Sequence, residues 1–308
     1  MGDVPVEIRV DTGNDPGAFP GHLRAVAEEI ERLEGLLSRF RPESQVSRLN
    51  RAAGGAAVAP GPEVLTVLET GLWLHRTTGG AFDVTVGPLV ALWRDAGLRG
   101  FLPSGEETAR ALALVGSDSL EFDRRSGTVR LPRAGMAIDL DGVSKGYIVD
   151  RAVEVLRARG VRRGLVNAGG DLRAFAPAGS DPFRIGIRDP AGGAEAILGE
   201  VPLRDGAAAT SGNYERFVEI GGRRYGHILD PRTGLPVDRV LSATVLAPEA
   251  MRAGGLATGL FLLGREAGGD LVESLPGVEA VLIYREGQDR GRWVSSGMPR
   301  VEWLAEGG

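Results

Sequence analysis

Apolar and polar positions alternate in some stretches of the chain and recur every three or four residues in others. Residues 4–10 alternate, as expected for a strand. Residues 22–38 place apolar side chains on one helical face, namely Leu23, Val26, Ile30, Leu33 and Leu37. A second helix is predicted over 62–78, ending at the glycine pair 79–80. The polar, proline-bearing segment FRPESQVSRLN and the Ala/Gly-rich loop 52–61 separate these two helices.

The remainder of the pattern consists mainly of strands joined by glycine turns. Hairpins are predicted over 118–133, 215–229 and 278–297, with turns at Ser126-Gly127 and Gly221-Gly222 in the first two. Strands are predicted over 164–168 and 241–247, the latter followed by a helix that runs toward Gly264. Helices and hairpins are mixed rather than strictly alternating, and no linker forces a division of the chain. We therefore predict an α+β fold and a single compact domain over residues 1–308.

Composition narrows the functional classes. The chain has 308 residues, of which 43% are apolar and 25% charged, a balance typical of globular proteins. Its net charge of -5 gives no basic surface for nucleic acid, and the absence of cysteine excludes disulfides and thiolate chemistry. Acidic residues interrupt the N-terminal segment, and the apolar tract 255–264 is about half of a membrane span. We expect a cytoplasmic protein without membrane insertion.

Lys145 is the single lysine among 36 basic residues. A coding bias toward arginine could leave one lysine by chance, but a site fitted to a compact ammonium would also retain it. Lys145 lies between Gly142 and Gly146, after a short apolar strand that is predicted to end at Asp139. A helix is predicted from Tyr147 to a stop at Gly160. This strand-to-helix junction favours an anion such as a phosphate.

Five short clusters depart from the ordinary pattern of core and surface. They are SRFRPESQVSRLN (38–50), TGGAFDVTVGPLVALW (78–93), AIDLDGVSKGYIVD (137–150), LVNAGGDLRAF (165–175), and ATSGNYERF with YGHILDPRTGLPV (209–217 and 225–237). Each alone indicates only turn chemistry. Together, and in this order, they resemble the FAD:protein FMN transferase (ApbE) family, over a stretch from Met1 to about Gly264.

This resemblance implies an activity and a set of partners. The family splits FAD at its pyrophosphate with Mg2+ and attaches FMN through a phosphoester to a Ser or Thr of an acceptor protein. Its α+β domain is related to the tunnelling fold. FAD, Mg2+ and an acceptor protein are therefore the expected substrate, cofactor and partner of this chain.

The resemblance also assigns roles to individual residues. Those that would contact the flavin nucleotide or dinucleotide are Met1, Asn50, Ala81, Phe82, Asp83, Asp139, Lys145, Gly169, Gly170 and Ile228. The matching histidine, His227, would help to activate the acceptor hydroxyl. Gly142 would offer a backbone carbonyl to the metal, and Thr258 a side-chain oxygen. Thr210 and Ser211 would lie at the rim of the site.

Simpler interpretations of the same residues stay open. GGAFD could be a buried turn in which Asp83 caps the next element, and Asn50 could be a turn residue. The pair Gly169-Gly170 could be a tight turn after a strand, and His227 a buried structural imidazole. The other two histidines, His22 and His75, are expected to be cap or surface residues.

The chain departs from the family at the metal site. The family usually has Asp four residues before the threonine, whereas this chain has Gly254 before Thr258. Mg2+ prefers oxygen ligands that include a carboxylate, so the cation should bind more weakly. Another acid (Asp139, Asp141 or Asp230) could complete the site, water could fill it, or the protein could bind flavin without turnover. The alternatives to transfer are therefore a flavin-binding carrier and an FAD pyrophosphatase that releases FMN and AMP.

Overall fold

The computed structural model describes residues 4–13, 15–193, 196–214 and 216–304. The chain divides into two compact units, each assembled from separated segments. The first unit comprises Met1–Leu33, Ser144–Ser211 and Val240–Gly308, and the second comprises Glu34–Val143 and Gly212–Arg239. Helices and antiparallel strand pairs occur together, which confirms the predicted α+β class. The prediction of a single domain stays a prediction.

The first unit is built on a seven-stranded sheet with the order β1-β4-β5-β8-β11-β12-β13. Its strands are β1 (Val6–Val10), β4 (Gly164–Ala168), β5 (Asp171–Phe175), β8 (Gly206–Gly212), β11 (Val240–Ala247), β12 (Glu279–Glu286) and β13 (Asp289–Val294). A three-stranded sheet contains β6 (Phe183–Arg188), β7 (Ile197–Leu203) and β14 (Glu302–Trp303). The helices are η1 (Pro16–Ala18), α1 (Phe19–Leu37), α6 (Asp141–Ala158), α7 (Ala250–Leu263) and α8 (Arg265–Ser274). The chain passes from one unit to the other four times: within α1, within α6, at the end of β8 and directly before β11.

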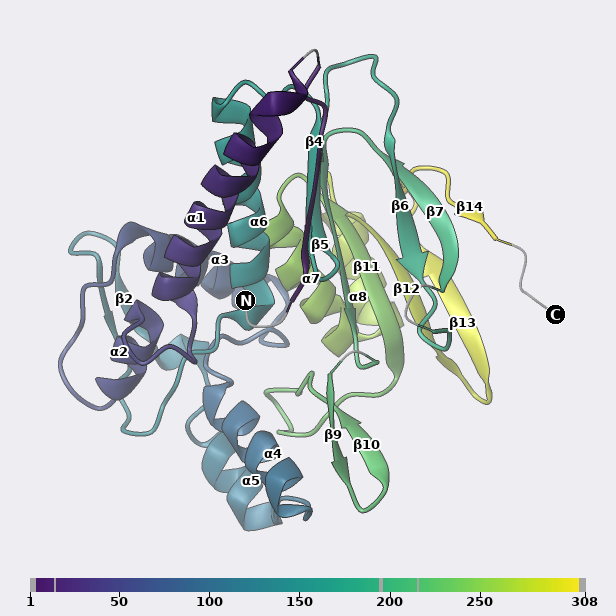
Figure 1. The fold of residues 1–308 in the computed structure, drawn as a ribbon. Coiled ribbons are helices and arrows are strands. Elements are labelled where there is room, and N and C mark those ends of the chain that lie inside the picture. Colours follow the sequence, from purple (N-terminus) through teal and green to yellow (C-terminus); the bar gives the residue numbers. More distant parts are fainter. Residues whose placement is uncertain (1–3, 14, 194–195, 215, 305–308) are drawn as a thin grey trace. The chain divides into compact units, whose positions relative to one another are not determined.

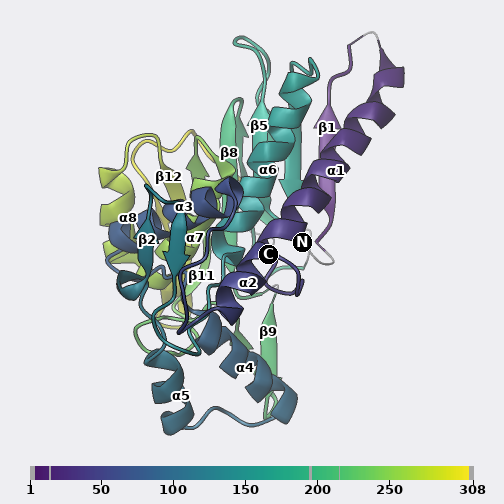
Figure 2. The same cartoon turned by 90° about the vertical axis from the view of Figure 1, so that its left-hand side faces the viewer.

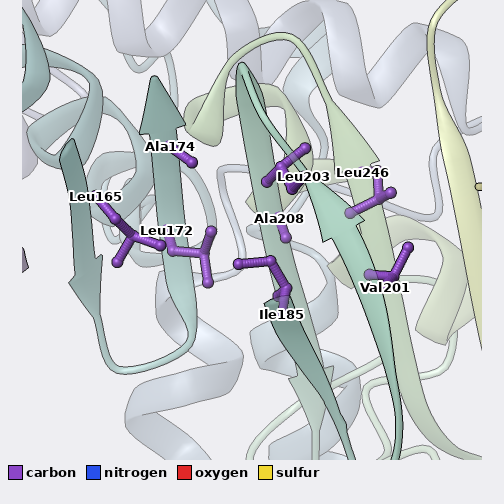
Figure 3. Packing of buried hydrophobic residues seen from close by; sticks show 8 residues of the cluster. All are labelled: Leu165, Leu172, Ala174, Ile185, Val201, Leu203, Ala208 and Leu246. Atoms are coloured by element: carbon purple, nitrogen blue, oxygen red, sulfur yellow. The ribbon is translucent and has the colours of Figure 1, made fainter. Parts of the chain in front are cut away.

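The two sheets enclose an apolar core on one face of the seven-stranded sheet. Leu165, Leu172, Ala208 and Leu246 of the large sheet face Val201 and its neighbours on the small one (Figure 3). Helices α7 and α8 pack against β11 and β12, and Figure 1 places them on the opposite side of the large sheet from β6 and β7. The first unit is therefore a three-layer arrangement of helices, large sheet and small sheet.

The second unit is mainly helical. Its helices are α2 (Gln45–Arg51), α3 (Pro62–Thr77), α4 (Gly87–Arg99), α5 (Gly105–Leu112) and η2 (Ser117–Ser119). Two small hairpins join β2 (Glu121–Asp123) to β3 (Thr128–Arg130), and β9 (Phe217–Ile220) to β10 (Arg223–Gly226). Helix α4 packs against α5 and β9 (Figure 2) around a core of Leu89, Trp93, Ala96, Ala111, Ile220 and Leu229.

Most of the predicted elements are present within a few residues of their expected bounds. The predicted strands at 4–10, 164–168 and 241–247 correspond to β1, β4 and β11, and the predicted helices to α1, α3 and α7. The three predicted hairpins are β2–β3, β9–β10 and β12–β13. The turn glycines Gly127, Gly221 and Gly222 have positive φ, which explains why glycine marks these turns.

One helix was not predicted, and two local predictions were wrong. The polar segment before residue 52 contains α2, which begins where the Ser44 side chain accepts a hydrogen bond from Ser47 N. The apolar run 136–138 is not a strand, although Ala137 makes one parallel bridge to Val86. Helix α6 begins at Asp141, six residues before the predicted start at Tyr147, so Lys145 lies inside a helix.

None of the helices in the described part of the chain is both long and apolar enough to cross a membrane.

Candidate functional site

The residues predicted from the sequence fall into two sets, each described within its own unit. The first unit contains Lys145, Gly169, Gly170 and Thr258. The second contains Asn50, Ala81, Phe82, Asp83, Asp139, Gly142, His227 and Ile228. Met1 lies outside the described residues.

Lys145 projects from α6 toward the start of β5. Its Nζ lies 3.1 Å from Oδ2 of Asp171, whose side chain is 8% exposed. Gly169 and Gly170, both with positive φ, form the two-residue turn between β4 and β5. This geometry matches a type I′ hairpin turn, so the tight-turn interpretation of the glycine pair holds locally. The turn places Asp171 where it pairs with the single lysine.

Helix α6 also fixes the start of α7. Gly146 lies so close that a Cβ atom there would be 2.2 Å from Ala250 O. One turn further along α6, the Asp150 carboxylate accepts hydrogen bonds from Ala250 N and Met251 N, each at 2.9 Å. Arg173 donates to the same carboxylate at 2.9 Å, and burial raises the pKa of Asp150. A side chain of α6 therefore caps α7 from outside that helix.

The capped helix α7 contains Gly254 and Thr258, the positions at which the metal site is expected to differ from that of the resembled family. Gly254 and Gly255 lie inside the helix and are buried, so the helix does not begin after them. Thr258 Oγ1 donates to Gly254 O at 3.2 Å and lies 3.2 Å from Ser211 Oγ. Thr210 Oγ1 is 2.9 Å from Thr244 Oγ1 in the neighbouring strand.

The oxygens around Thr258 do not fit a magnesium site by themselves. The carbonyl and the two hydroxyls are all neutral, whereas Mg2+ is usually bound through at least one carboxylate. Within the described residues, no group of three or more acidic, histidine or cysteine side chains is arranged to hold a metal ion. Gly142, the other residue predicted to bind the metal, is the second residue of α6. It belongs to the second unit, whereas α6 from Ser144 onward belongs to the first.

In the second unit, Asn50 takes the place of a strand partner. Its Nδ2 donates to Ile138 O at 2.9 Å, and its Oδ1 accepts from Ile138 N at 2.7 Å. These two bonds satisfy the backbone of an apolar residue that a strand neighbour would otherwise pair. Asn50 is therefore a structural tie to the segment that carries Asp139, rather than a turn residue.

Asp139 is a buried carboxyl beside a second acid. Its Oδ1 accepts from Asp141 N at 3.0 Å, and Arg39 Nε lies 3.1 Å from its Oδ2. The same Nε is 3.5 Å from Asp141 Oδ2 and makes no aligned hydrogen bond. Burial, with Asp141 adding to it, raises the pKa of Asp139 from 3.8 to about 6, against the opposing effect of Arg39.

The Asp139 carboxyl is expected to titrate with a midpoint near pH 6, as the raised pKa of about 6 indicates. Because its folded-state pKa exceeds 3.8, the folded chain binds more protons than the unfolded chain between these two values. The contribution of this group to the free energy of unfolding therefore decreases as the pH rises through that window. Carbon-13 NMR of side-chain carboxyls measures the midpoint, and the signal is assigned by its loss in Asp139→Asn. A midpoint close to the ordinary value would contradict the burial described above.

The segment Ala81–Asp83 is buried and held by side chains. Ala81 is fully buried, and Phe82 and Asp83 are 5% and 6% exposed. The Asp83 carboxylate accepts from the backbone and hydroxyl of Thr85 and of Ser117, at 2.5 to 2.8 Å. This is the buried turn with a capping aspartate that the sequence left open as an alternative. The carboxylate oxygens are engaged by the protein's own donors.

His227 follows directly after β10 and is exposed, which is inconsistent with a buried structural imidazole. Its Nδ1 lies 3.1 Å from Arg216 O. Since a carbonyl oxygen can only accept, Nδ1 carries the proton and the neutral ring has its basic lone pair on Nε2. The next residue, Ile228, is 7% exposed, and its carbonyl accepts from Val237 N at 3.2 Å.

The structure corrects the prediction for the other histidines. His22 is 9% exposed, and its Nδ1 accepts from Arg159 Nε at 3.2 Å. The His75 side chain is 11% exposed and contacts Phe82 and Asp83. Neither is a surface residue, because Arg159 contacts the ring of His22, and Phe82 and Asp83 contact the ring of His75.

Sequence reasoning missed several residues that hold these candidates in place. Asp171 directly follows the glycine pair, and Asp150 follows Gly146 by one helical turn, so both positions were within the quoted clusters. Their acidic side chains on otherwise apolar elements were the available signal. Arg39 and Ser117 gave no such signal, since each reaches its partner only through the tertiary fold.

Comparisons with known proteins agree on one family. The model of the ApbE family matches residues 2–282. The FAD:protein FMN transferase of Treponema pallidum (strain Nichols) is 35% identical over 294 residues, covering 90% of this chain and 81% of the relative. One solved structure, the flavin transferase ApbE from Vibrio cholerae, superposes with a TM-score of 0.82 at 30% identity, covering 94% of this chain and 93% of that one. The ApbE protein of Thermotoga maritima gives a TM-score of 0.83 at 32% identity, covering 95% and 93%.

The order of the sequence clusters, the α+β fold and these matches over nearly the whole chain lead to one conclusion: the chain belongs to the ApbE family.

Proposed function

We propose that this chain is an FAD:protein FMN transferase. The observation that carries the proposal is the match, over 90% of the chain, to a relative of that name. The site contributes an exposed histidine whose tautomer leaves Nε2 as the basic nitrogen. An exposed base of this kind suits proton removal from a substrate that arrives from solution.

The proposed reaction transfers the FMN part of FAD to a hydroxyl group of the acceptor protein. The hydroxyl oxygen of an acceptor Thr or Ser attacks the FMN phosphorus of FAD, and the bond from that phosphorus to the bridging oxygen breaks. AMP leaves with the bridging oxygen, and FMN remains joined to the acceptor as a phosphoester. The hydroxyl proton passes to Nε2 of His227.

The remaining predicted residues take binding roles in this proposal. Lys145 supplies positive charge to the pyrophosphate, and its pairing with Asp171 at 3.1 Å fixes the direction of the ammonium. Gly169 and Gly170 allow close backbone approach. The residues proposed to line the nucleotide are Met1, Asn50, Ala81, Phe82, Asp83, Asp139 and Ile228. Because the Asp83 carboxylate is engaged internally, we assign the contacts of 81–83 mainly to the backbone.

Magnesium, with Thr258 and Gly142 as its proposed ligands, is the cofactor that the family resemblance implies. A cation bound at Thr258 would supply charge neutralisation at the pyrophosphate, and Gly142 would offer a carbonyl. The neutral oxygens around Thr258 do not fit it, so the steps above involve only residues of this chain. The same observation favours a second candidate function, a flavin-binding carrier without turnover.

The experiment is an AMP-release assay with purified protein and FAD. A candidate acceptor protein with an exposed Thr or Ser is included or omitted, and Mg2+ is added or removed with EDTA. AMP that appears only with the acceptor, together with flavin fluorescence on the acceptor band, supports transfer. AMP without acceptor indicates a pyrophosphatase, and bound but intact FAD indicates the carrier.

The predicted location is also part of this proposal. We propose a cytoplasmic protein whose partners are FAD and an acceptor protein, without nucleic acid. Fractionation of the source cells with an antibody to the chain tests the location.

Replacement of Lys145 by arginine is expected to weaken FAD binding roughly tenfold, although the charge is kept. The planar guanidinium differs from the ammonium in reach and cannot repeat its 3.1 Å contact with Asp171 unchanged. Fluorescence titration of FAD measures the Kd, and Arg110→Lys on exposed α5 is the matched control for an exchange of the two cations. An unchanged Kd in Lys145→Arg would mean that the single lysine is a chance remainder without a role in FAD binding.

A further inference from the structure

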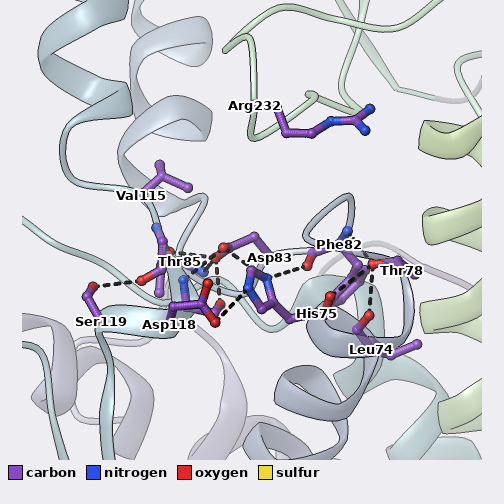
Figure 4. Close-up of polar contacts among 12 residues, drawn as sticks. Leu74, His75, Thr78, Phe82, Asp83, Thr85, Val115, Asp118, Ser119 and Arg232 are labelled. Atoms are coloured by element: carbon purple, nitrogen blue, oxygen red, sulfur yellow. Dashed lines mark hydrogen bonds and ion pairs between the residues drawn. The ribbon is translucent and has the colours of Figure 1, made fainter.

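His75 occupies the end of α3 where the chain turns back toward the predicted nucleotide segment. The side chain is 11% exposed. Its Nδ1 lies 3.1 Å from Phe82 O, and because that oxygen only accepts, Nδ1 donates. Figure 4 shows the ring between the Phe82 carbonyl and the carboxylates of Asp83 and Asp118.

The turn between His75 and Phe82 is closed from both ends. Gly79 and Gly80 have positive φ, which reverses the chain, and Gly80 N donates to His75 O at 2.8 Å. Thr78 Oγ1 accepts from Phe82 N at 2.9 Å and donates to Leu74 O at 2.8 Å. Thr78 therefore fixes the N–H of Phe82, and His75 fixes its carbonyl.

The imidazole also connects this turn to a second segment. Its Nδ1 is 3.3 Å from Asp83 Oδ2, and its Nε2 is 3.3 Å from Asp118 Oδ1. Asp83 in turn binds Ser117, the neighbour of Asp118. One ring thus contacts the turn on one side and the 117–118 segment on the other.

We infer that His75 is a positioning residue that sets the conformation of residues 79–83 for the nucleotide. The inference rests on the proposed function, since that segment is assigned to the flavin nucleotide there. A turn whose peptide groups are fixed before binding loses less conformational entropy when the ligand arrives. His75 acts through Phe82 and Asp83 and does not itself touch substrate.

The test compares two variants that retain different nitrogen positions. Asparagine places its amide nitrogen where Nδ1 stands and can donate to Phe82 O, whereas glutamine extends its amide one atom further. We expect His75→Gln to raise the KM for FAD about tenfold with kcat little changed, and His75→Asn to stay close to wild type. His22→Gln, at the other buried histidine, is the control for lost stability alone.

If His75 only stabilises the fold and does not position residues 79–83, the KM values of the variants should differ from those above. In that case the KM would follow the fall in Tm, and His22→Gln would raise it as much as His75→Gln. Any one of three results overturns the inference. They are an equal rise in KM in both variants, a wild-type KM in His75→Gln, and a tenfold higher KM in a folded His75→Asn. If wild-type protein neither binds nor cleaves FAD, the proposed function fails first and this inference fails with it; normal wild-type turnover with an unaffected Gln variant rejects the inference alone.

Discussion

Replacing His227 with alanine is expected to lower the rate of FMN transfer by about a hundredfold to a thousandfold while leaving FAD affinity nearly unchanged. The ring is exposed, so its removal opens no cavity, and its Nδ1 contact with Arg216 O at 3.1 Å assigns the basic lone pair to Nε2. Without that nitrogen the acceptor hydroxyl keeps its proton and is a weak nucleophile. Single-turnover kinetics with saturating FAD separate this effect from binding.

Added imidazole provides the control for His227→Ala. A free base that enters the exposed position should restore part of the rate, and restoration should increase with pH as imidazole loses its proton. His227→Asn keeps a donor for Arg216 O but lacks the base, so it should be as slow as the alanine variant. A transfer rate equal to wild type in either variant would remove His227 from the mechanism.

Replacing Gly146 with alanine is expected to destabilise the first unit by about 3 kcal/mol or more. Alanine usually stabilises a helix interior relative to glycine by about 1 kcal/mol, so the expected sign is reversed at this position. The reason is the 2.2 Å approach of the new Cβ to Ala250 O, with Ala250 C and Met251 N also within 2.5 Å. These are backbone atoms that Asp150 holds in place, and they cannot rotate away. Urea denaturation measures the free energy of unfolding.

Gly35→Ala is the matched control, because Gly35 also lies inside a helix and a Cβ there meets nothing within 4 Å. It should be as stable as wild type or slightly more stable. If Gly146→Ala were equally stable, the close packing of α6 on the start of α7 would be wrong. The same result would weaken the assignment of Lys145, which stands next to Gly146 on α6.

Glycine pairs gave the most accurate predictions of local structure. Gly169-Gly170 and Gly221-Gly222 adopt positive φ at hairpin turns, a conformation that few other residues accept. The strand predicted at 136–138 failed for a long-range reason. Its apolar pattern is real, but Asn50, 88 residues away, binds both backbone groups of Ile138 where a strand could pair, and the segment keeps only one bridge, from Ala137 to Val86.

The candidate site was predictable where a residue type was unusual in its context. The single lysine and the exposed histidine in a turn-rich segment could be selected from the sequence. The contacts that define their surroundings could not. Asp171 becomes a partner of Lys145 only through the hairpin turn, and His75 reaches Phe82 only because two left-handed glycines reverse the chain.

Calorimetric titration of FAD into the purified chain, with FMN and AMP as separate comparison ligands, tests the central claim most directly. The account predicts heat of association with FAD and a Kd lower than that of either half, because the pyrophosphate and both nucleotide parts contribute to binding. No measurable association with FAD, at protein concentrations where the chain is folded, would contradict it.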